Sequence, residues 1–254
     1  MRHVPRPEGV IVMKRVAIIQ SNYIPWKGYF DIIGAVDEFL IFDDVQFTRR
    51  DWRNRNRIVQ GGKLLWLTIP VVSKGAFEEP VNRIEIADPG WARKHWASLV
   101  HAYGKADCFR EFAPQLEAAY AKAASLPRLT EVNELFLRLL SEILGLKTGF
   151  HRTEHIPQVA ADATGRLVEI CLARGATAYL SGPAAKAYID RPQFEAAGIT
   201  LAYANYQGYP VYGQGLEPFE HGVSLLDILF RFGAAARSHL KTSHDPKSFM
   251  DLDG

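Results

Sequence analysis

The fold is decided by the stretch RVAIIQSNYIPWKGYF at residues 15–30, together with EFLIFD at residues 38–43. Val16–Gln20 is a short apolar run that ends in a polar residue, as buried strands of parallel sheets do. Tyr29–Val36 carries apolar residues at helical spacing, and Glu38–Asp43 predicts a second buried strand. A crossover of this length between two apolar strands favours parallel pairing. The sequence therefore predicts an α/β fold with a mostly parallel sheet.

The composition is that of an ordinary globular protein. Of the 254 residues, 48% are hydrophobic and 23% are charged, which excludes disordered, collagen-like and coiled-coil chains. A formal net charge of +2 is too balanced for nucleic acid to be the expected partner. The two cysteines suit neither a disulfide framework nor a metal site, and apolar runs such as Leu64–Val72 are too short to span a membrane. We expect a cytoplasmic protein.

Three consecutive helical patterns interrupt the α/β alternation. They predict a helical subdomain at residues 91–145, inserted between α/β core segments at residues 13–90 and 146–240. Residues 1–12 are expected to be a disordered leader, and residues 241–254 a flexible tail. The predicted helices are Trp91–Tyr103, Arg110–Ala124, Leu129–Leu144, Thr164–Arg174 and Leu225–Phe232, and further strands are predicted at Leu64–Val72, Val81–Ile86, Gly149–Ile156, Ala178–Leu180 and Thr200–Tyr206.

Polar loops follow the predicted strands. In doubly wound sheets, ligands bind beyond the carboxyl ends of the strands, so we expect Gln20–Tyr23, Asp43–Gln46 and Ser181–Tyr188 to line one cleft. A buried strand that runs into a Ser-Gly step is typical of loops that hold anions. The candidate substrate-binding residues in these loops are Gln20, Asn22, Gln46, Ser181 and Tyr188.

The first of these loops can be compared with the HxGH signature of nucleotidylyltransferases, in which a strand-loop-helix unit presents two histidines to nucleotide phosphates. Trp26-x-Gly28-Tyr29 has this spacing, with aromatic residues in both histidine positions. An aromatic ring can stack on a base or a sugar, which makes Tyr23, Trp26 and Tyr29 candidate ligand contacts. A packed aromatic turn is the alternative. The comparison predicts a Rossmann-like, nucleotidylyltransferase-like sheet with an α-helical insertion.

Two residues are the candidate catalytic groups, Asp44 and His95. Asp43 and Asp44 follow a predicted strand, where neighbouring side chains point in different directions, and we expect Asp43 to contact substrate and Asp44 to act as a base or metal contact. A local salt bridge is the alternative. His95 follows Lys94 on a predicted helix and could contact an anion. The HxxEH spacing at 151–155 suits a strand better than a zinc-binding helix, so no metal site is predicted, and a nucleotide or Mg²⁺ is the open choice of cofactor.

Residues 49–57 form the most unusual segment, with five arginines in nine residues. Such a cluster repels itself unless anions compensate, and guanidinium groups match phosphate and carboxylate geometry. Side chains two residues apart on an extended segment face the same side, as Arg55 and Arg57 would. We therefore expect Arg50, Arg55 and Arg57 to bind an anionic ligand. A solvated loop that pairs with nearby aspartates is the alternative.

Several spaced motifs together resemble the WbqC-like protein family. They are QSNYIPWKGYF, DDVQF, RRDWRNRNRI, WLTIPV, the W-x-x-KHW segment, YLSG followed by Tyr188, and SLLDILFRFG, and they extend from about Arg15 to Gly233. Members of this family occur in bacterial surface-polysaccharide (O-antigen) gene clusters, and a glycine or other aminoacyl transferase role has been suggested for them. The resemblance implies a transferase that acts on a sugar or nucleotide-linked sugar.

Three functions are open from the sequence. The first is an acyl or aminoacyl transferase in polysaccharide biosynthesis, the second a nucleotidylyltransferase-like enzyme, and the third a non-catalytic protein that binds a nucleotide sugar. Each needs a small-molecule substrate that carries phosphate or carboxylate, and none needs nucleic acid or a membrane span. Binding of ATP or CTP with magnesium would favour the second, and binding of a nucleotide sugar without turnover the third.

Overall fold

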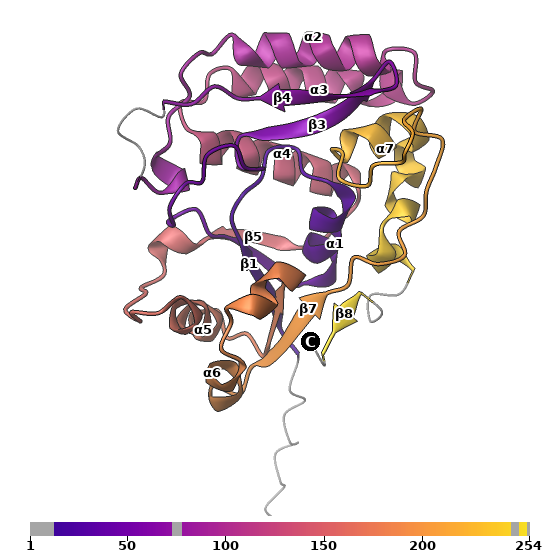
Figure 1. The fold of residues 1–254 in the computed structure, drawn as a ribbon. Helices are drawn as coiled ribbons and strands as arrows, with labels where there is room; N and C mark the ends of the chain where they lie inside the picture. Colours follow the sequence, from indigo (N-terminus) through magenta and orange to yellow (C-terminus); the bar gives the residue numbers. More distant parts are fainter. Residues whose placement is uncertain (1–12, 73–77, 245–248, 253–254) are drawn as a thin grey trace, which may run out of the picture.

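A mostly parallel sheet forms the centre of the computed structural model, which describes residues 13–72, 78–244 and 249–252 (Figure 1). The order of its strands is β5-β2-β1-β6-β7-β8. The first five are parallel, and β8 pairs antiparallel with β7. The parallel pairing expected of the first two strands is confirmed. The strands are β1 Arg15–Ile19, β2 Glu38–Ile41, β5 Gly149–Arg152, β6 Ala178–Ser181, β7 Thr200–Ala204 and β8 Met250–Asp251.

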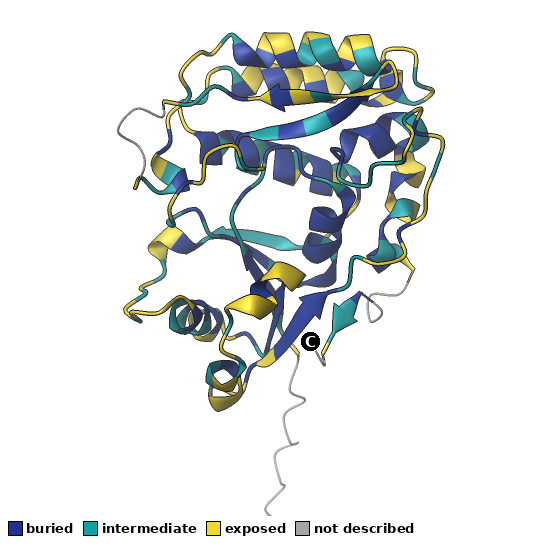
Figure 2. Cartoon of the chain, viewed as in Figure 1, coloured by how far each residue is buried: buried dark blue, intermediate teal, exposed yellow. Residues whose placement is uncertain are grey.

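Both faces of the sheet are covered, because successive side chains of a buried strand enter different hydrophobic clusters. On β1, Val16 and Ile18 pack in the cluster of α5 and α6, whereas Ala17 belongs to the larger cluster on the other face. The larger cluster also holds the buried sides of α1, α4 and α7, and Figure 2 shows the buried strands between these layers. The helices that flank the sheet are α1 Lys27–Ala35, α4 Leu129–Ile143, α5 Ala163–Ala173, α6 Arg191–Ala196 and α7 Leu226–Phe232.

Three helices form where the insertion is predicted: α2 Trp91–Tyr103, α3 Phe109–Ala123 and α4. They pack with an antiparallel hairpin of β3 Arg55–Gln60 and β4 Lys63–Thr68, above α1 and the sheet in Figure 1. Gly61 and Gly62 turn the hairpin, and both have positive φ, as a tight two-residue hairpin turn requires. The helices and the hairpin share one hydrophobic cluster with α1 and the sheet.

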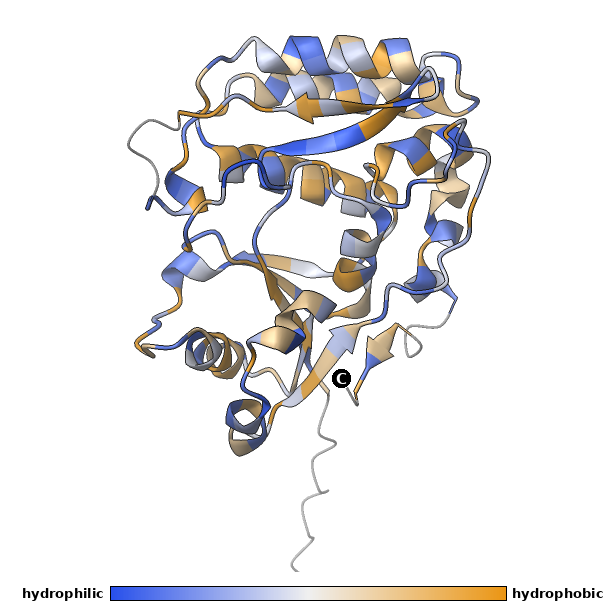
Figure 3. Cartoon of the chain, in the orientation of Figure 1, coloured by the Kyte–Doolittle hydropathy of each residue, from blue (hydrophilic) through white to orange (hydrophobic). Residues whose placement is uncertain are grey.

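Several predicted elements differ from the structure. The strand predicted at Val81–Ile86 is a 3-10 turn, Val81–Arg83, because Pro80 begins it and isolated bridges replace a ladder. The strand predicted from Gly149 ends at Arg152 and continues as the 3-10 turn Thr153–His155. β3 was not predicted as a strand, since its Arg-Asn-Arg start is hydrophilic, as Figure 3 shows. The remaining 3-10 turns are Pro183–Ala187, Gly233–His239 and Lys241–Ser243.

The described residues include part of the predicted tail and none of the predicted leader. The predicted disordered leader, residues 1–12, lies outside the described residues. Within the predicted tail, the described residues include a 3-10 turn and β8. The turn is held because the buried carboxylate of Asp31 accepts hydrogen bonds from the backbone N–H groups of Lys241 and Thr242, at 3.1 and 2.8 Å. Such a contact with a distant side chain leaves no periodic pattern in the sequence.

A buried aromatic cluster joins the first loop to the helices. The hydroxyl of Tyr23 lies 3.0 Å from Nδ1 of His95 and 2.7 Å from the hydroxyl of Tyr120. Trp91 and Phe136 pack edge-on against the Tyr23 ring. Burial lowers the pKa of His95 to about 4, so its imidazole is neutral near pH 7. These contacts fix the first loop to the α2 and α4 helices.

We predict that His95 makes the protein sensitive to acid. The unfolded chain takes up a proton near the ordinary pKa of 6.5, whereas native His95 does so only near 4. Stability is therefore lost as pH falls through this window, by about 3 kcal/mol for this residue. His95→Gln should be less stable than the wild type at pH 7 but show a flatter decline between pH 6.5 and 4 in urea denaturation.

His101 supplies the control, since it lies exposed on the same helix. His101→Gln should leave the pH dependence of the free energy of unfolding unchanged. An equally steep decline in His95→Gln and the wild type would contradict the prediction.

Candidate functional site

A cavity of about 600 Å³ opens beyond the carboxyl ends of β1 and β6. These strands are neighbours, and β1 has β2 on its other side, so the strand order reverses between them. We call it the switch-point cavity. Its walls come from β1 and the loop after it, the loop after β2, the start of α5 and the loop after β6. The lining includes Gln20, Asn22, Trp26, Tyr29, Phe42, Val45, Trp52, Arg53, Arg166, Tyr179, Ser181, Gly182, Tyr188 and Tyr206.

Part of the predicted convergence of loops is found in this cavity, which Gln20, Asn22, Ser181 and Tyr188 all line. Of the predicted segment Asp43–Gln46, Val45 lines the cavity, whereas Asp43, Asp44 and Gln46 do not. The lining residues meet because parallel strands bring their carboxyl ends to one edge of the sheet. Trp26 and Tyr29 also line the cavity. Tyr29 donates a hydrogen bond from its hydroxyl to the carbonyl of Gln20 at 2.8 Å, which fixes the end of β1.

Two arginines give the cavity its positive charge. Arg53 donates hydrogen bonds to Oδ1 of Asn22 at 2.7 Å and to Oε1 of Gln20. Its Nε is buried and has no hydrogen-bond partner among the described residues. Arg166, on α5, donates to Oε1 of Gln158 at 3.0 Å, and its guanidinium lies 5.4 Å from the centre of the Phe42 ring. Asp and Glu are absent from the part of the lining that the structure describes.

Aromatic rings form much of the remaining wall. Trp26 packs edge-on against Tyr206, with ring centres 4.9 Å apart, and Tyr188 is 66% exposed at the mouth. The Trp26 ring folds back over the first turn of α1: a Cβ at Gly28 would lie 2.3 Å from it. The Trp26-x-Gly28 spacing therefore has a steric reason, since a side chain at Gly28 would push the indole out of the wall.

The loop that carries these residues is held by one buried amide. Nδ2 of Asn56 donates to the carbonyls of Tyr23 and Ile24, at 3.0 and 2.9 Å. Ile24 has a φ of 37°, a left-handed conformation that is strained for a β-branched residue. The Asn56 bonds therefore stabilise a backbone path that the loop sequence alone disfavours.

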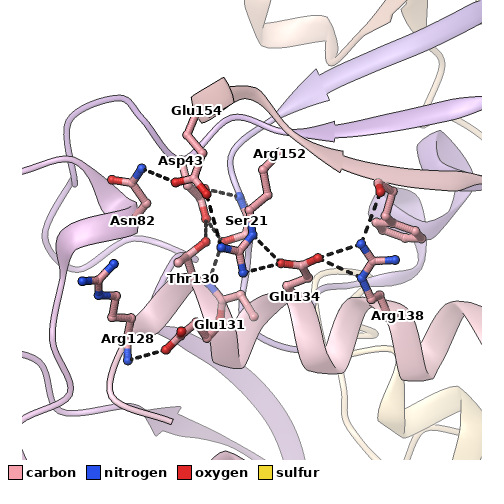
Figure 4. Close-up of polar contacts among 12 residues, drawn as sticks. Ser21, Asp43, Asn82, Arg128, Thr130, Glu131, Glu134, Arg138, Arg152 and Glu154 are labelled. Carbon is pink, nitrogen blue, oxygen red and sulfur yellow. Dashed lines mark hydrogen bonds and ion pairs between the residues drawn. The ribbon is translucent and has the colours of Figure 1, made fainter. Parts of the chain in front are cut away.

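The carboxylate of Asp43 lies beneath the cavity and does not line it. It accepts hydrogen bonds from the backbone N–H and hydroxyl of Ser21, at 2.8 and 2.6 Å, and from the hydroxyl of Thr130 at 2.5 Å (Figure 4). Asn133 on α4 donates to Oγ of Ser21 and to the carbonyl of Arg53, both at 2.9 Å. Burial raises the pKa of Asp43, and the bonds from Ser21 and Thr130 oppose this rise. Asp43 thus organises the loops and is shielded from substrate.

Asp44 follows the end of β2, as Asp43 does, and has different hydrogen-bond partners. Its carboxylate accepts hydrogen bonds from the hydroxyl of Thr153 and from Nε2 of Gln158, the latter at 2.8 Å. Both aspartates line a very narrow space beside Arg152 and Glu154, and neither lines the switch-point cavity. The structure therefore does not bring Asp44 to the cavity that holds Ser181.

The other predicted site residues also lie elsewhere. Tyr23 and His95 are in the aromatic core, with no more than 6% of either residue exposed. Gln46 is exposed, and its carbonyl accepts a bond from Nε2 of Gln20 at 3.4 Å. Arg50 is exposed with a φ of 58°. Arg55 and Arg57 lie outside this cavity, beside exposed tryptophans: the guanidinium of Arg55 lies 4.2 Å from the Trp66 ring, and Arg57 lies 5.3 Å from Trp52.

Sequence reasoning missed three charged residues. Arg53 belongs to the recognised arginine cluster, but nothing in the local pattern separates it from Arg55. Arg166 lies on a predicted helix with no distinguishing motif. Lys27 is buried beside His221, whose Nδ1 lies 3.0 Å from its amine, and beside the ring of Tyr209 at 4.9 Å. Burial lowers the pKa of Lys27 to about 8.

The described residues contain neither a group of side chains suited to a metal ion nor a helix suited to span a membrane. Over residues 13–72, 78–244 and 249–252, no three His, Cys, Asp or Glu side chains are grouped so that they could hold a metal ion. In the same ranges, no helix is both long enough and apolar enough to cross a membrane. Cys171 is buried, and burial raises the pKa of its thiol to about 12.

Fold and cavity together define a mixed α/β protein with a ligand-sized pocket where the strand order of a mostly parallel sheet reverses. The chain belongs to the WbqC-like protein family, whose model matches residues 20–239. It is 42% identical over 229 residues to "Uncharacterized protein Rv1507c" of Mycobacterium tuberculosis (strain ATCC 25618 / H37Rv), a match that covers 90% of this chain and 98% of that protein. No solved structure matches the chain.

We predict that the two adjacent aspartates differ sharply in their effect on stability. Asp43→Ala would leave three buried donors without an acceptor and should lower the free energy of unfolding by about 2–4 kcal/mol. Asp44→Ala is the matched control and should cost about 1 kcal/mol, because Asp44 is only partly buried and the hydroxyl of Thr153 keeps the carbonyl of Ile41 as an acceptor. Urea denaturation at pH 7 measures both. A loss in Asp44→Ala as large as that in Asp43→Ala would contradict this role for Asp43.

Proposed function

We propose that the protein binds a nucleotide-linked sugar, or a closely similar phosphate-bearing sugar, in the switch-point cavity and transfers an acyl or aminoacyl group to it. The observation that carries the proposal is the position of Arg53 and Arg166 in a cavity without described carboxylates. Such a site favours an anionic ligand, since guanidinium groups bind phosphate bidentately.

The strand order supports the phosphate-bearing part of the ligand. Counted along the chain without β3, β4 and β8, the parallel strands lie in the order 3-2-1-4-5. This is the order of doubly wound sheets that bind nucleotides at the reversal point. The likeness is one of architecture, and it supports a Rossmann-like interpretation of the fold.

The aromatic lining supports the sugar or base. Trp26 and Tyr206 present edges and faces at one wall, and Tyr188 lies at the mouth. Aromatic side chains bury the apolar faces of rings while leaving ring hydroxyls free for hydrogen bonds. The side-chain amides of Gln20 and Asn22 are placed to supply such bonds.

Acyl transfer fits this lining better than nucleotidyl transfer does. In acyl transfer, the sugar amine or hydroxyl attacks the acyl carbonyl and forms an amide or ester bond, while the bond between the acyl carbon and the donor breaks. The proton that the nucleophile loses passes to the leaving group of the donor, so the reaction depends mainly on orientation. Nucleotidyl transfer would draw on the two histidine positions that Trp26 and Tyr29 occupy here. A non-catalytic nucleotide-sugar-binding protein is the second candidate, because neither Asp44 nor His95 reaches the cavity.

We expect UDP-glucose to bind the protein in isothermal titration calorimetry, and Arg53→Gln and Arg166→Gln each to weaken this binding by about 10–100-fold. That range corresponds to the loss of a charged hydrogen bond. Arg83→Gln is the control, because Arg83 is exposed and pairs only loosely with Glu79, at 3.9 Å. Affinities unchanged by both cavity variants, or no binding of UDP-, dTDP- or CDP-sugars, would refute the proposal.

Turnover separates the two candidates. We expect the sugar recovered after incubation with acyl-coenzyme A or with an activated amino acid to gain the mass of the acyl group in mass spectrometry. Tight binding without any gain in mass, over a panel of such donors, would leave the non-catalytic binding protein.

A further inference from the structure

A second cavity shares a wall with the switch-point cavity. It has a volume of about 340 Å³ and is lined by Asn22, Pro25, Trp26, Trp52, Asn56 and Gly222. Asn22, Trp26 and Trp52 line both cavities. Groups bound in the two cavities would be separated only by these side chains. An acceptor carbohydrate longer than one sugar ring would therefore reach from one cavity into the other, and its second contact would orient the reacting sugar.

Exposed indoles continue this second cavity onto the surface of the β3–β4 hairpin. Trp52 and Trp66 are 37% and 42% exposed, and their ring centres lie 5.5 Å apart at an angle of 33°. Large aromatic side chains that remain this exposed commonly mark binding surfaces. Together with Arg55 and Arg57, we call these two residues the indole platform.

Arg57 connects the platform to the cavity. It pairs with Trp66 across the hairpin, its guanidinium lies 5.5 Å from the Trp66 ring, and it reaches the carbonyl of Gly222 in the cavity wall at 3.5 Å. Its Nε is buried without a hydrogen-bond partner among the described residues. Nη1 lies 3.1 Å from a carboxylate oxygen of Glu220. Arg57 therefore holds one anionic group already and has a further donor to satisfy.

We propose that the second cavity and the indole platform form an extension of the acceptor site, which binds the acidic part of a carbohydrate whose acylated sugar lies in the switch-point cavity; the inference rests on the proposed transferase function. A pyranose ring would pack against the exposed part of Trp52 in the cavity wall, beside Trp66, whose ring already carries the Arg55 guanidinium. The carboxylate or phosphate of the sugar would take the place of the Glu220 carboxylate at Arg57. Arg55, stacked on Trp66, adds positive charge at the outer end.

Sugar chemistry fits this site better than nucleic acid does. The cavity is enclosed on several sides and holds about 340 Å³, the size of one or two sugar rings and too small for a strand. The chain carries a formal net charge of only +2, whereas binding of a nucleic acid backbone draws on many positive charges. Glu220, the present partner of Arg57, would repel a polyanion and would compete with a single acidic group.

The test uses trigalacturonate as an acidic carbohydrate, glucose 6-phosphate as a phosphorylated one, and maltotriose as a neutral match. Tryptophan fluorescence follows each titration of the full chain, because the platform holds two exposed indoles. We expect trigalacturonate or glucose 6-phosphate to bind more tightly than maltotriose, and the tighter of the two identifies the acidic group. Arg57→Gln should weaken this binding about tenfold, and Glu220→Gln should strengthen it several-fold by removing the competing carboxylate.

A loss of folding would weaken binding in both variants. The opposite changes in affinity expected of Arg57→Gln and Glu220→Gln therefore exclude it as the cause. Arg83→Gln should change neither affinity, because Arg83 lines neither cavity and pairs with Glu79. Equal binding of maltotriose and the acidic sugars, or no effect of Arg57→Gln and Glu220→Gln, would overturn the inference. A single-stranded oligonucleotide that binds more tightly than every sugar would also overturn it. Binding of UDP-glucose without any acidic sugar refutes the extension of the acceptor site alone, whereas binding of acidic sugar without UDP-glucose refutes the proposed function.

Discussion

The buried carboxylate of Asp43 is the interaction on which the rest of the site depends. It follows the second strand, and its three accepted hydrogen bonds connect the loop after the first strand and the start of α4 to one point. Taking a carboxylate out of water costs several kcal/mol unless hydrogen bonds replace the lost solvent, and here they come from backbone and hydroxyl groups. Through Ser21 and Asn133 the same network reaches the backbone of Arg53. The Arg53 side chain therefore extends from a fixed backbone position.

Charge in this protein is divided between pairs that hold the fold and groups that face open space. Glu134 takes up both Arg138 and Arg152 beside the Asp43 network, as Figure 4 shows. Arg53 and Arg166 instead line a cavity and donate hydrogen bonds to the neutral amides of Asn22 and Gln158, and Arg53 also lies 3.7 Å from a carboxylate oxygen of Asp51. A phosphate can displace an amide at little electrostatic cost, whereas at Arg53 it would compete with Asp51. Amide groups thus orient both cavity arginines.

The sequence predicts the parts of this molecule that repeat locally. The apolar runs at Val16–Gln20 and Glu38–Asp43 indicate strands buried on both faces, and the rule for strand ends places Gln20, Asn22 and Ser181 in one cavity. Prediction from local pattern fails where contacts between segments decide the structure. β3 begins with hydrophilic residues and is a strand because it pairs with β4 along its whole length. Histidine is a residue type common in functional sites, but His95 lies in the core, where the hydroxyl of Tyr23 contacts it from a distant segment. The carboxylate of Asp44 accepts a hydrogen bond from Thr153, and no local sequence pattern connects these two residues.

The walls of the switch-point cavity come from opposite ends of the chain, from Ile18 to Tyr206. During synthesis from the ribosome, the first strand and its loop emerge long before β6 and the loop after β7. A nascent chain that lacks these later segments therefore does not yet have the complete cavity. A ligand held by all of these walls would stabilise the protein against global unfolding, rather than only against the local opening of one loop.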